Sequence, residues 1–99
     1  MNNAYLAHIH LPKEFTPELY GKIPAQRDLI NELLKKQIIL SYSLDMERKN
    51  VWAFIAANSE NEVMDILSTF PIIKFVRVSI HELAFYETTA SYMPDLIMN

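Results

Sequence analysis

Three histidines and an arginine stand at alternating positions in two β-like segments, one near the start of the chain and one near its end. His8 and His10 share the first segment, and Arg77 and His81 share the second. Histidine titrates near neutral pH and can act as a general base or acid, while an arginine can stabilise an enolate or bind a carboxylate. Together these groups are the minimum needed to remove a proton from a carbon next to a carbonyl.

Six elements must position these side chains. Alternating apolar residues predict strands at 3–11, 38–46, 51–57 and 74–86, and apolar stripes at helical spacing predict helices at 17–36 and 59–70. The resulting order, βαββαβ, is that of the ferredoxin-like (split βαβ) arrangement of the α+β class. In that arrangement, an antiparallel four-stranded sheet carries both helices on one face.

Both helices begin with recognisable capping residues. Thr16 followed by Pro17 is a typical N-cap with proline at the first helical position, and Ser59 with Glu62 forms a capping box. Pro24 has no N–H to donate to the preceding turn, so we expect the first helix to be kinked or split in two at that residue.

The two middle strands are predicted to pair around a turn at 47–50, whose last residue, an asparagine, tolerates positive φ. This turn would set Ser43 opposite Phe54 and Asp45 opposite Trp52. Asp45 then lies near the end of the hairpin, where we expect a solvated charge.

Period-two alternation divides the strand side chains between two faces of the sheet. The apolar face must meet the helices, and in the second strand it takes Leu40, Tyr42 and Leu44. Across this interface the positions expected to be fully buried are Leu33, Ile55, Leu67 and Val78. The opposite face collects polar and aromatic side chains: His8, His10, Ser41, Ser43, Asp45, Trp52, Phe54, Arg77, Ser79 and His81.

On that second face, Trp52 and Phe54 would form a flat apolar wall for a ring-shaped ligand. The serines Ser41, Ser43 and Ser79 would complete the substrate-binding surface. With Leu6 added, the face is too apolar to be left in water. The simplest cover is the same face of a second copy. This predicts a homodimer, an α+β barrel with a polar-lined cavity for a small-molecule ligand.

Short runs spaced along residues 8–90 form a further pattern: Leu11-Pro12, Thr16-Pro17, Ala25-Gln26-Arg27-Asp28-Leu29 leading to Leu33, Ser59 at a helix start, and Leu67-Ser68-Thr69-Phe70-Pro71-Ile72. This pattern resembles that of the muconolactone isomerase family. The resemblance implies a ferredoxin-like subunit in a dimeric barrel or a higher homo-oligomer. It also implies cofactor-free movement of a double bond in an unsaturated lactone.

The first strand departs from the family's pattern. When the sequences are aligned on Pro12, His10 stands where the family has a lysine and His8 where it has a threonine. After the first helix, Gln37 replaces a glycine, and Glu87-Thr88-Thr89-Ala90 replaces a His-Pro-Ser-Ser segment. Because the polar groups differ, the expected substrate class is a small lactone or carbonyl compound rather than muconolactone itself.

Other interpretations of the same face remain open. The histidines and the arginine could form satisfied hydrogen bonds across a dimer interface. His8 and His10 could share a metal with His81, but no carboxylate pattern completes the ligand set, so no metal or other cofactor is expected. The barrel could also be a non-catalytic module that binds a small ligand or only assembles, or a cofactor-free oxygenase.

The composition excludes several classes of protein. The 99 residues are 51% apolar, which rules out a disordered chain, and suit a single domain over residues 1–99. A net charge of −3 leaves no basic surface for nucleic acid or an acidic membrane, and the absence of cysteine excludes disulfides and a thiolate nucleophile. The chain has no pattern of a signal peptide or a membrane span, so we expect a cytoplasmic protein. The apolar tail, residues 87–99, could pack on a partner subunit.

Overall fold

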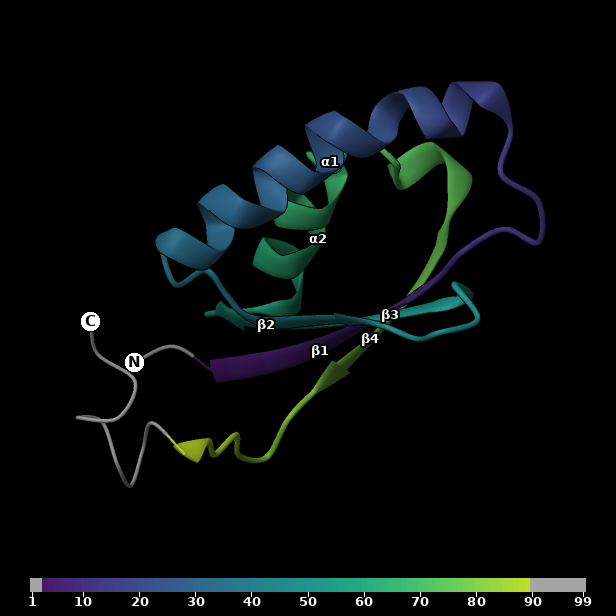
Figure 1. Cartoon of the computed structure of the whole chain (residues 1–99). Helices are drawn as coiled ribbons and strands as arrows, with labels where there is room; N and C mark the ends of the chain where they lie inside the picture. Colours follow the sequence, from purple (N-terminus) through teal and green to yellow (C-terminus); the bar gives the residue numbers. More distant parts are fainter. Residues whose placement is uncertain (1–2, 90–99) are drawn as a thin grey trace.

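A four-stranded sheet with two helices on one side organises residues 3–89, the part of the chain that the computed structural model describes (Figure 1). Along the chain the elements are β1 (Asn3–His10), α1 (Pro17–Lys35), β2 (Ile39–Leu44), β3 (Asn50–Ala57), α2 (Glu60–Ser68), the 3₁₀ helix η1 (Ile73–Phe75) and β4 (Arg77–Glu82). The strand order is β2-β3-β1-β4, and every neighbouring pair is antiparallel. The predicted ferredoxin-like α+β fold is confirmed.

The hydrophobic core lies between the sheet and the helices. Alternate side chains of β1 and β3 are buried on this side: Tyr5, Ala7, Ile9, Val51, Ala53, Ile55 and Ala57. Ile30 of α1, Val63 and Leu67 of α2, and Phe70 pack against them. The intervening residues of both strands are only partly covered, as the period-two alternation predicts.

Two of the four positions expected to be fully buried are so. Ile55 and Leu67 are at most 2% exposed. Leu33 and Val78 pack against the core but are only partly buried. Leu33 lies near the end of α1 and Val78 on the edge strand β4, where fewer neighbouring elements cover a side chain.

The predicted helix caps are present. The Thr16 hydroxyl accepts a hydrogen bond from the Leu19 N–H at 3.2 Å, and the Ser59 hydroxyl accepts one from the Glu62 N–H at 3.1 Å. The Glu62 carboxylate accepts from the side-chain amide of Asn58 at 3.4 Å. Each cap thus satisfies a backbone N–H that the helix itself leaves without a partner.

Helix α1 runs unbroken through Pro24, so the expectation of a split at this residue is wrong. Pro24 and Tyr20, whose carbonyl loses its helical partner, are both exposed. Water can therefore take the role of the missing hydrogen-bond donor to that carbonyl. The helical hydrogen bond that Pro24 cannot make is thus lost at an exposed part of the helix.

The end of α1 is closed by Gln37 in the left-handed region, at φ 60°. The N–H groups of Gln37 and Ile38 donate to the carbonyls of Leu34 and Leu33, both at 3.0 Å. This is a Schellman motif, and its left-handed position is the one that glycine occupies most easily.

In the β2–β3 hairpin the predicted register is wrong by two residues. Ser43 pairs with Trp52 rather than with Phe54, and Phe54 pairs with Ser41. A shift of two residues leaves each side chain on its predicted face, because the side-chain period of a strand is also two.

A bulge in β2 changes one core position. The pairing is irregular between Ile39 and Ser41, so Ile39 reaches the core and is 1% exposed, while Leu40 is 38% exposed. Leu40 therefore does not belong to the buried core beneath the helices, contrary to its predicted placement. The extra residue of a bulge breaks the strict alternation from which that placement was predicted.

Strand β4 is shorter than the predicted segment 74–86, because η1 precedes it and the strand ends at Glu82. The chain then continues on the side of the sheet away from the helices (Figure 1). Most of the predicted apolar tail, from residue 90 onward, lies outside the described residues. Within residues 3–89, neither α1 nor α2 is long and apolar enough to cross a membrane.

Candidate functional site

The face of the sheet opposite the helices, called here the open face, brings together side chains of β1, β3 and β4. Pairing across β1 sets each histidine between two partners: His8 between Trp52 and Ser79, and His10 between Asn50 and Arg77. These residues come from distant parts of the chain. The antiparallel register alone makes them neighbours.

His8 lies in the middle of a stack of rings. Its centroid is 4.0 Å from that of His10 and 5.6 Å from that of Trp52, whose ring plane is within 23° of parallel. All three side chains are half-buried. The stack holds the His8 ring in one plane while leaving it partly accessible.

A hydrogen-bonded chain also reaches His8. Its Nε2 lies 2.9 Å from Oδ1 of Asn50, and Nδ2 of Asn50 donates to Oδ2 of Asp45 at 3.0 Å. An ionised carboxylate only accepts, so Asn50 must use its amide nitrogen toward Asp45 and its amide oxygen toward His8. Nε2 of His8 is therefore the donor. In the neutral ring, Nδ1 then holds the free lone pair.

Asp45 anchors this chain by closing the hairpin turn. Its Oδ1 accepts from the backbone N–H groups of Lys49 at 2.8 Å and Asn50 at 3.0 Å. The hydrogen bonds from Asn50, followed by those from the turn backbone, hold the pKa of the Asp45 carboxyl below its ordinary value of 3.8. Asp45 is thus a partly exposed charge near the end of the hairpin, and it also closes the turn. Arg48, at φ 59°, takes the positive-φ position that the sequence assigned to Asn50.

This arrangement predicts a pH-dependent effect of Asp45→Asn on stability. Because folding lowers the pKa of Asp45, its ionised form stabilises the fold above the ordinary value of 3.8, and that stabilisation is lost as the pH falls through the lower, folded-state pKa. Wild type should therefore be the more stable protein near pH 7, and the difference should shrink below about pH 4. Urea unfolding of both proteins across this pH range checks it. A difference that stays constant with pH would contradict the prediction.

His10 differs from His8 in its surroundings. Desolvation by burial lowers the pKa of His10 below its ordinary value of 6.5, and the nearby charges of His8 and Arg77 lower it further. Its Nε2 lies 3.5 Å from the hydroxyl of Ser79. At neutral pH His10 is therefore an uncharged neighbour of His8, and Arg77 provides the positive charge on this part of the face.

Three other predicted site residues lie toward the opposite end of the open face: Ser41, Phe54 and His81. Phe54 packs against Tyr86 with ring centroids 5.1 Å apart, and the Tyr86 hydroxyl donates to that of Ser41 at 3.5 Å. His81 is exposed and pairs with Leu6. Within residues 3–89 it makes no hydrogen bond or ring contact with the other two histidines. Ser43 is exposed beside Trp52.

Two residues of this face were missed from the sequence. Asn50 stands two residues before Trp52, so strand alternation could have placed it on the open face, but its asparagine identity favoured the turn. Tyr86 was assigned to the last strand without a role. It belongs instead to the segment after β4 that covers the Phe54 end of the face.

The described residues offer little to hold a metal ion. Between residues 3 and 89, no three His, Asp or Glu side chains come close enough together to ligate one. His8 and His10 are adjacent, and Asn50 and Ser79 occupy their Nε2 atoms, so only the Nδ1 atoms would be left for a metal.

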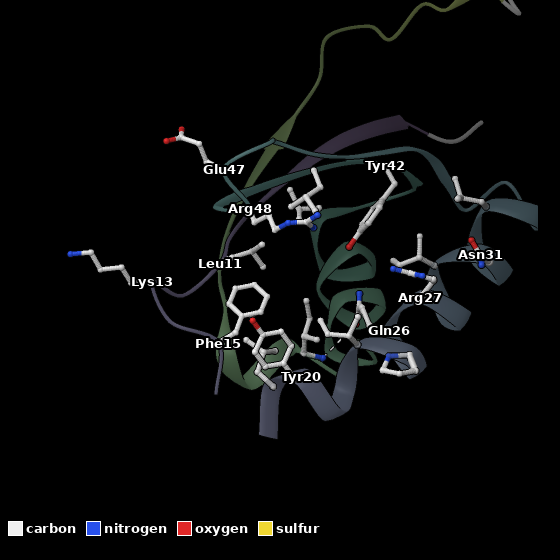
Figure 2. Close-up of a pocket in the computed structure, with 18 residues that line it drawn as sticks. Leu11, Lys13, Phe15, Tyr20, Gln26, Arg27, Asn31, Tyr42, Glu47 and Arg48 are labelled. Carbon is white, nitrogen blue, oxygen red and sulfur yellow. Dashed lines mark hydrogen bonds between the residues drawn. The ribbon is translucent and has the colours of Figure 1, made fainter. Parts of the chain in front are cut away.

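A large cavity lies on the other side of the sheet, between α1 and the β2–β3 hairpin (Figure 2). Its volume is about 940 Å³, and none of the predicted site residues lines it. This cavity is therefore separate from the open face. Comparisons with models of known protein families and with curated proteins find no match to the chain.

Proposed function

We propose that the protein is a small cofactor-independent enzyme that moves a proton, and with it a double bond, in a small lactone or carbonyl substrate on the open face. The hydrogen-bonded chain Asp45–Asn50–His8 carries this proposal. It fixes the ring orientation and tautomer of one half-buried histidine, which is what a general base requires.

In the proposed reaction His8 works as a shuttle for one proton. Nδ1 takes the proton from the carbon next to the carbonyl, and the electron pair of the broken C–H bond moves through that carbon to the carbonyl oxygen, giving an enolate. The imidazolium then returns the proton to the γ carbon of the conjugated enolate. The double bond moves by one position, and neutral His8 is restored without any oxidant or cofactor.

Neighbouring groups support this role. Arg77, paired with His10 across the strands, supplies positive charge for the enolate oxygen or for a substrate carboxylate. The neutral state of His10 favours transfer to His8, because it adds no second positive charge beside the imidazolium. Trp52, stacked on His8, offers a flat wall for a ring-shaped substrate.

We further propose that the active form is a cytoplasmic homodimer or a larger homo-oligomer in which a second copy covers the open face. Trp52, Phe54 and Leu6 support this, because they are only half-buried in a single chain. A cover would also exclude water and strengthen the electrostatic interactions of Arg77.

The test is proton exchange on unsaturated γ-lactones and small cyclic ketones in D₂O, followed by NMR, with α-angelica lactone as the first probe. We expect the protein to accelerate loss of the α-proton signal and formation of the conjugated isomer beyond an equal concentration of free imidazole. Light scattering at micromolar concentration should give at least a dimeric mass. No acceleration across the panel would overturn the proposed activity. A monomeric mass would overturn the proposal that a second copy covers the open face.

A further inference from the structure

The cavity between α1 and the β2–β3 hairpin is separate from the open face. It lies on the helix side of the sheet (Figure 2), whereas His8 lies on the open face. Its volume of about 940 Å³ is in the upper part of the range for small-molecule sites. Most of the lining is apolar, and Phe15 and Tyr20 form an aromatic wall with ring centroids 5.4 Å apart.

The floor of the cavity contains a buried amide donor that is only weakly paired within residues 3–89. Gln26 is 5% exposed, and its Oε1 accepts from the backbone N–H of Ile72 at 3.4 Å. Its Nε2 is buried and has only a weak contact with the Tyr42 hydroxyl, which falls short of a well-formed hydrogen bond. Leaving a buried N–H group unpaired is costly, so such a group points to a partner that arrives from outside the chain.

A second donor faces the first. In Figure 2 the hydroxyl of Tyr42 and the amide nitrogen of Gln26 point toward one another across the cavity floor. Burial raises the pKa of Tyr42, although a side-chain hydrogen bond from the Gln26 amide partly opposes the rise. The phenol therefore stays protonated and can donate. One acceptor oxygen placed between these two groups would satisfy both.

The rim adds positive charge. Arg27 and Arg48 point toward the cavity, whereas Lys13 and Glu47 point away from it (Figure 2). Neither arginine forms an ion pair with another residue between 3 and 89, and Glu47 lies 3.9 Å from Lys49. An acceptor that carries negative charge suits this rim better than a neutral one.

We infer that this cavity binds a small carboxylic acid with an apolar body, held by Gln26 and Tyr42 at the floor and by the two arginines at the rim. One carboxylate oxygen accepts from Nε2 of Gln26 and from the Tyr42 hydroxyl. The apolar body lies against the wall of Phe15 and Tyr20. Because the site faces the helices, it is a second ligand site that does not depend on the proposed proton transfer at His8.

The test uses decanoate, decan-1-ol and acetate as probes of the full-length protein, with calorimetry for affinity and amide NMR for location. We expect saturable binding of one decanoate per chain, with shifts gathered around Gln26 and Tyr42. Decan-1-ol, which lacks the charge, and acetate, which lacks the apolar body, should each bind at least about tenfold more weakly.

Variants locate the polar contacts. Gln26→Met and Tyr42→Phe should each weaken decanoate binding about tenfold or more. Arg27→Gln at the exposed rim should also weaken decanoate binding, and it keeps the test valid if one of the buried variants fails to fold. His8→Ala should leave the affinity unchanged, which separates this site from the proposed active site. The inference is overturned if decanoate does not saturate below about 1 mM. It is equally overturned if decan-1-ol binds as tightly as decanoate, if the variants bind decanoate like wild type, or if the shifts fall on the open face.

Discussion

Replacing His8 by alanine is expected to slow lactone proton exchange by about 10²- to 10⁴-fold, the usual contribution of a general base. The substitution removes the nitrogen that takes the proton. Because His8 is half-buried on the open face and lies outside the helix-facing core, the fold should survive. Initial rates under saturating substrate measure the effect. Circular dichroism and light scattering show whether fold and assembly are retained.

Two further variants make the result interpretable. Asn50→Ala removes the acceptor that holds Nε2 of His8, so it should give a smaller loss of rate than His8→Ala. Met46→Ala changes a side chain that is 97% exposed in the hairpin turn and should keep the wild-type rate. An unchanged rate in His8→Ala would remove His8 from the mechanism. If the same variant instead dissociated into monomers, with no activity in wild type, the histidines would be interface residues.

Leu67→Ala is expected to lower the free energy of unfolding by about 2–5 kcal/mol. Leu67 is 2% exposed and belongs to the cluster in which α2 packs against the central strands, so its truncation leaves a cavity that the helix cannot easily fill. Urea unfolding followed by circular dichroism measures the change.

The matched control is Met64→Ala on the same helix. Met64 is 53% exposed, so its loss should change the free energy of unfolding by no more than about 0.5 kcal/mol. Similar effects at the two positions would mean that the buried face of α2 is assigned wrongly.

The faces of the sheet could be predicted from the sequence because side-chain alternation is a local property of each strand. Tyr5, Ala7 and Ile9 are buried, while His8 and His10 lie on the other side, as their order in the chain requires. The helix starts were also predictable, since Thr16 and Ser59 cap their own helices through bonds to residues three positions away.

The hairpin register was not predictable in the same way. It depends on how the turn closes, and here Asp45 binds the backbone of Lys49 and Asn50 with one carboxylate oxygen. The composition of residues 47–50 also suits a turn. The sequence pattern therefore does not distinguish the predicted turn from the observed one, which Asp45 closes. The same uncertainty concealed the role of Asn50, which the observed register places in β3.

The cavity beside Gln26 was beyond prediction for a different reason. The cavity arises from the way α1 packs over the β2–β3 hairpin. A polar side chain on a helix, such as Gln26, is normally predicted to be exposed, but Gln26 is buried. Only the packed structure reveals that Gln26 is buried, with a nitrogen that is weakly paired among the described residues.

The rate of lactone proton exchange as a function of pH, measured together with an NMR titration of the His8 ring, tests most directly the claim that neutral His8 is the base. A base acts only in its unprotonated form, so the rate should rise with pH and level off, with the same midpoint as the His8 titration. His10 serves as the internal comparison, because burial lowers its pKa. A rate that followed the His10 titration, or that kept rising with hydroxide concentration, would contradict the assignment of His8.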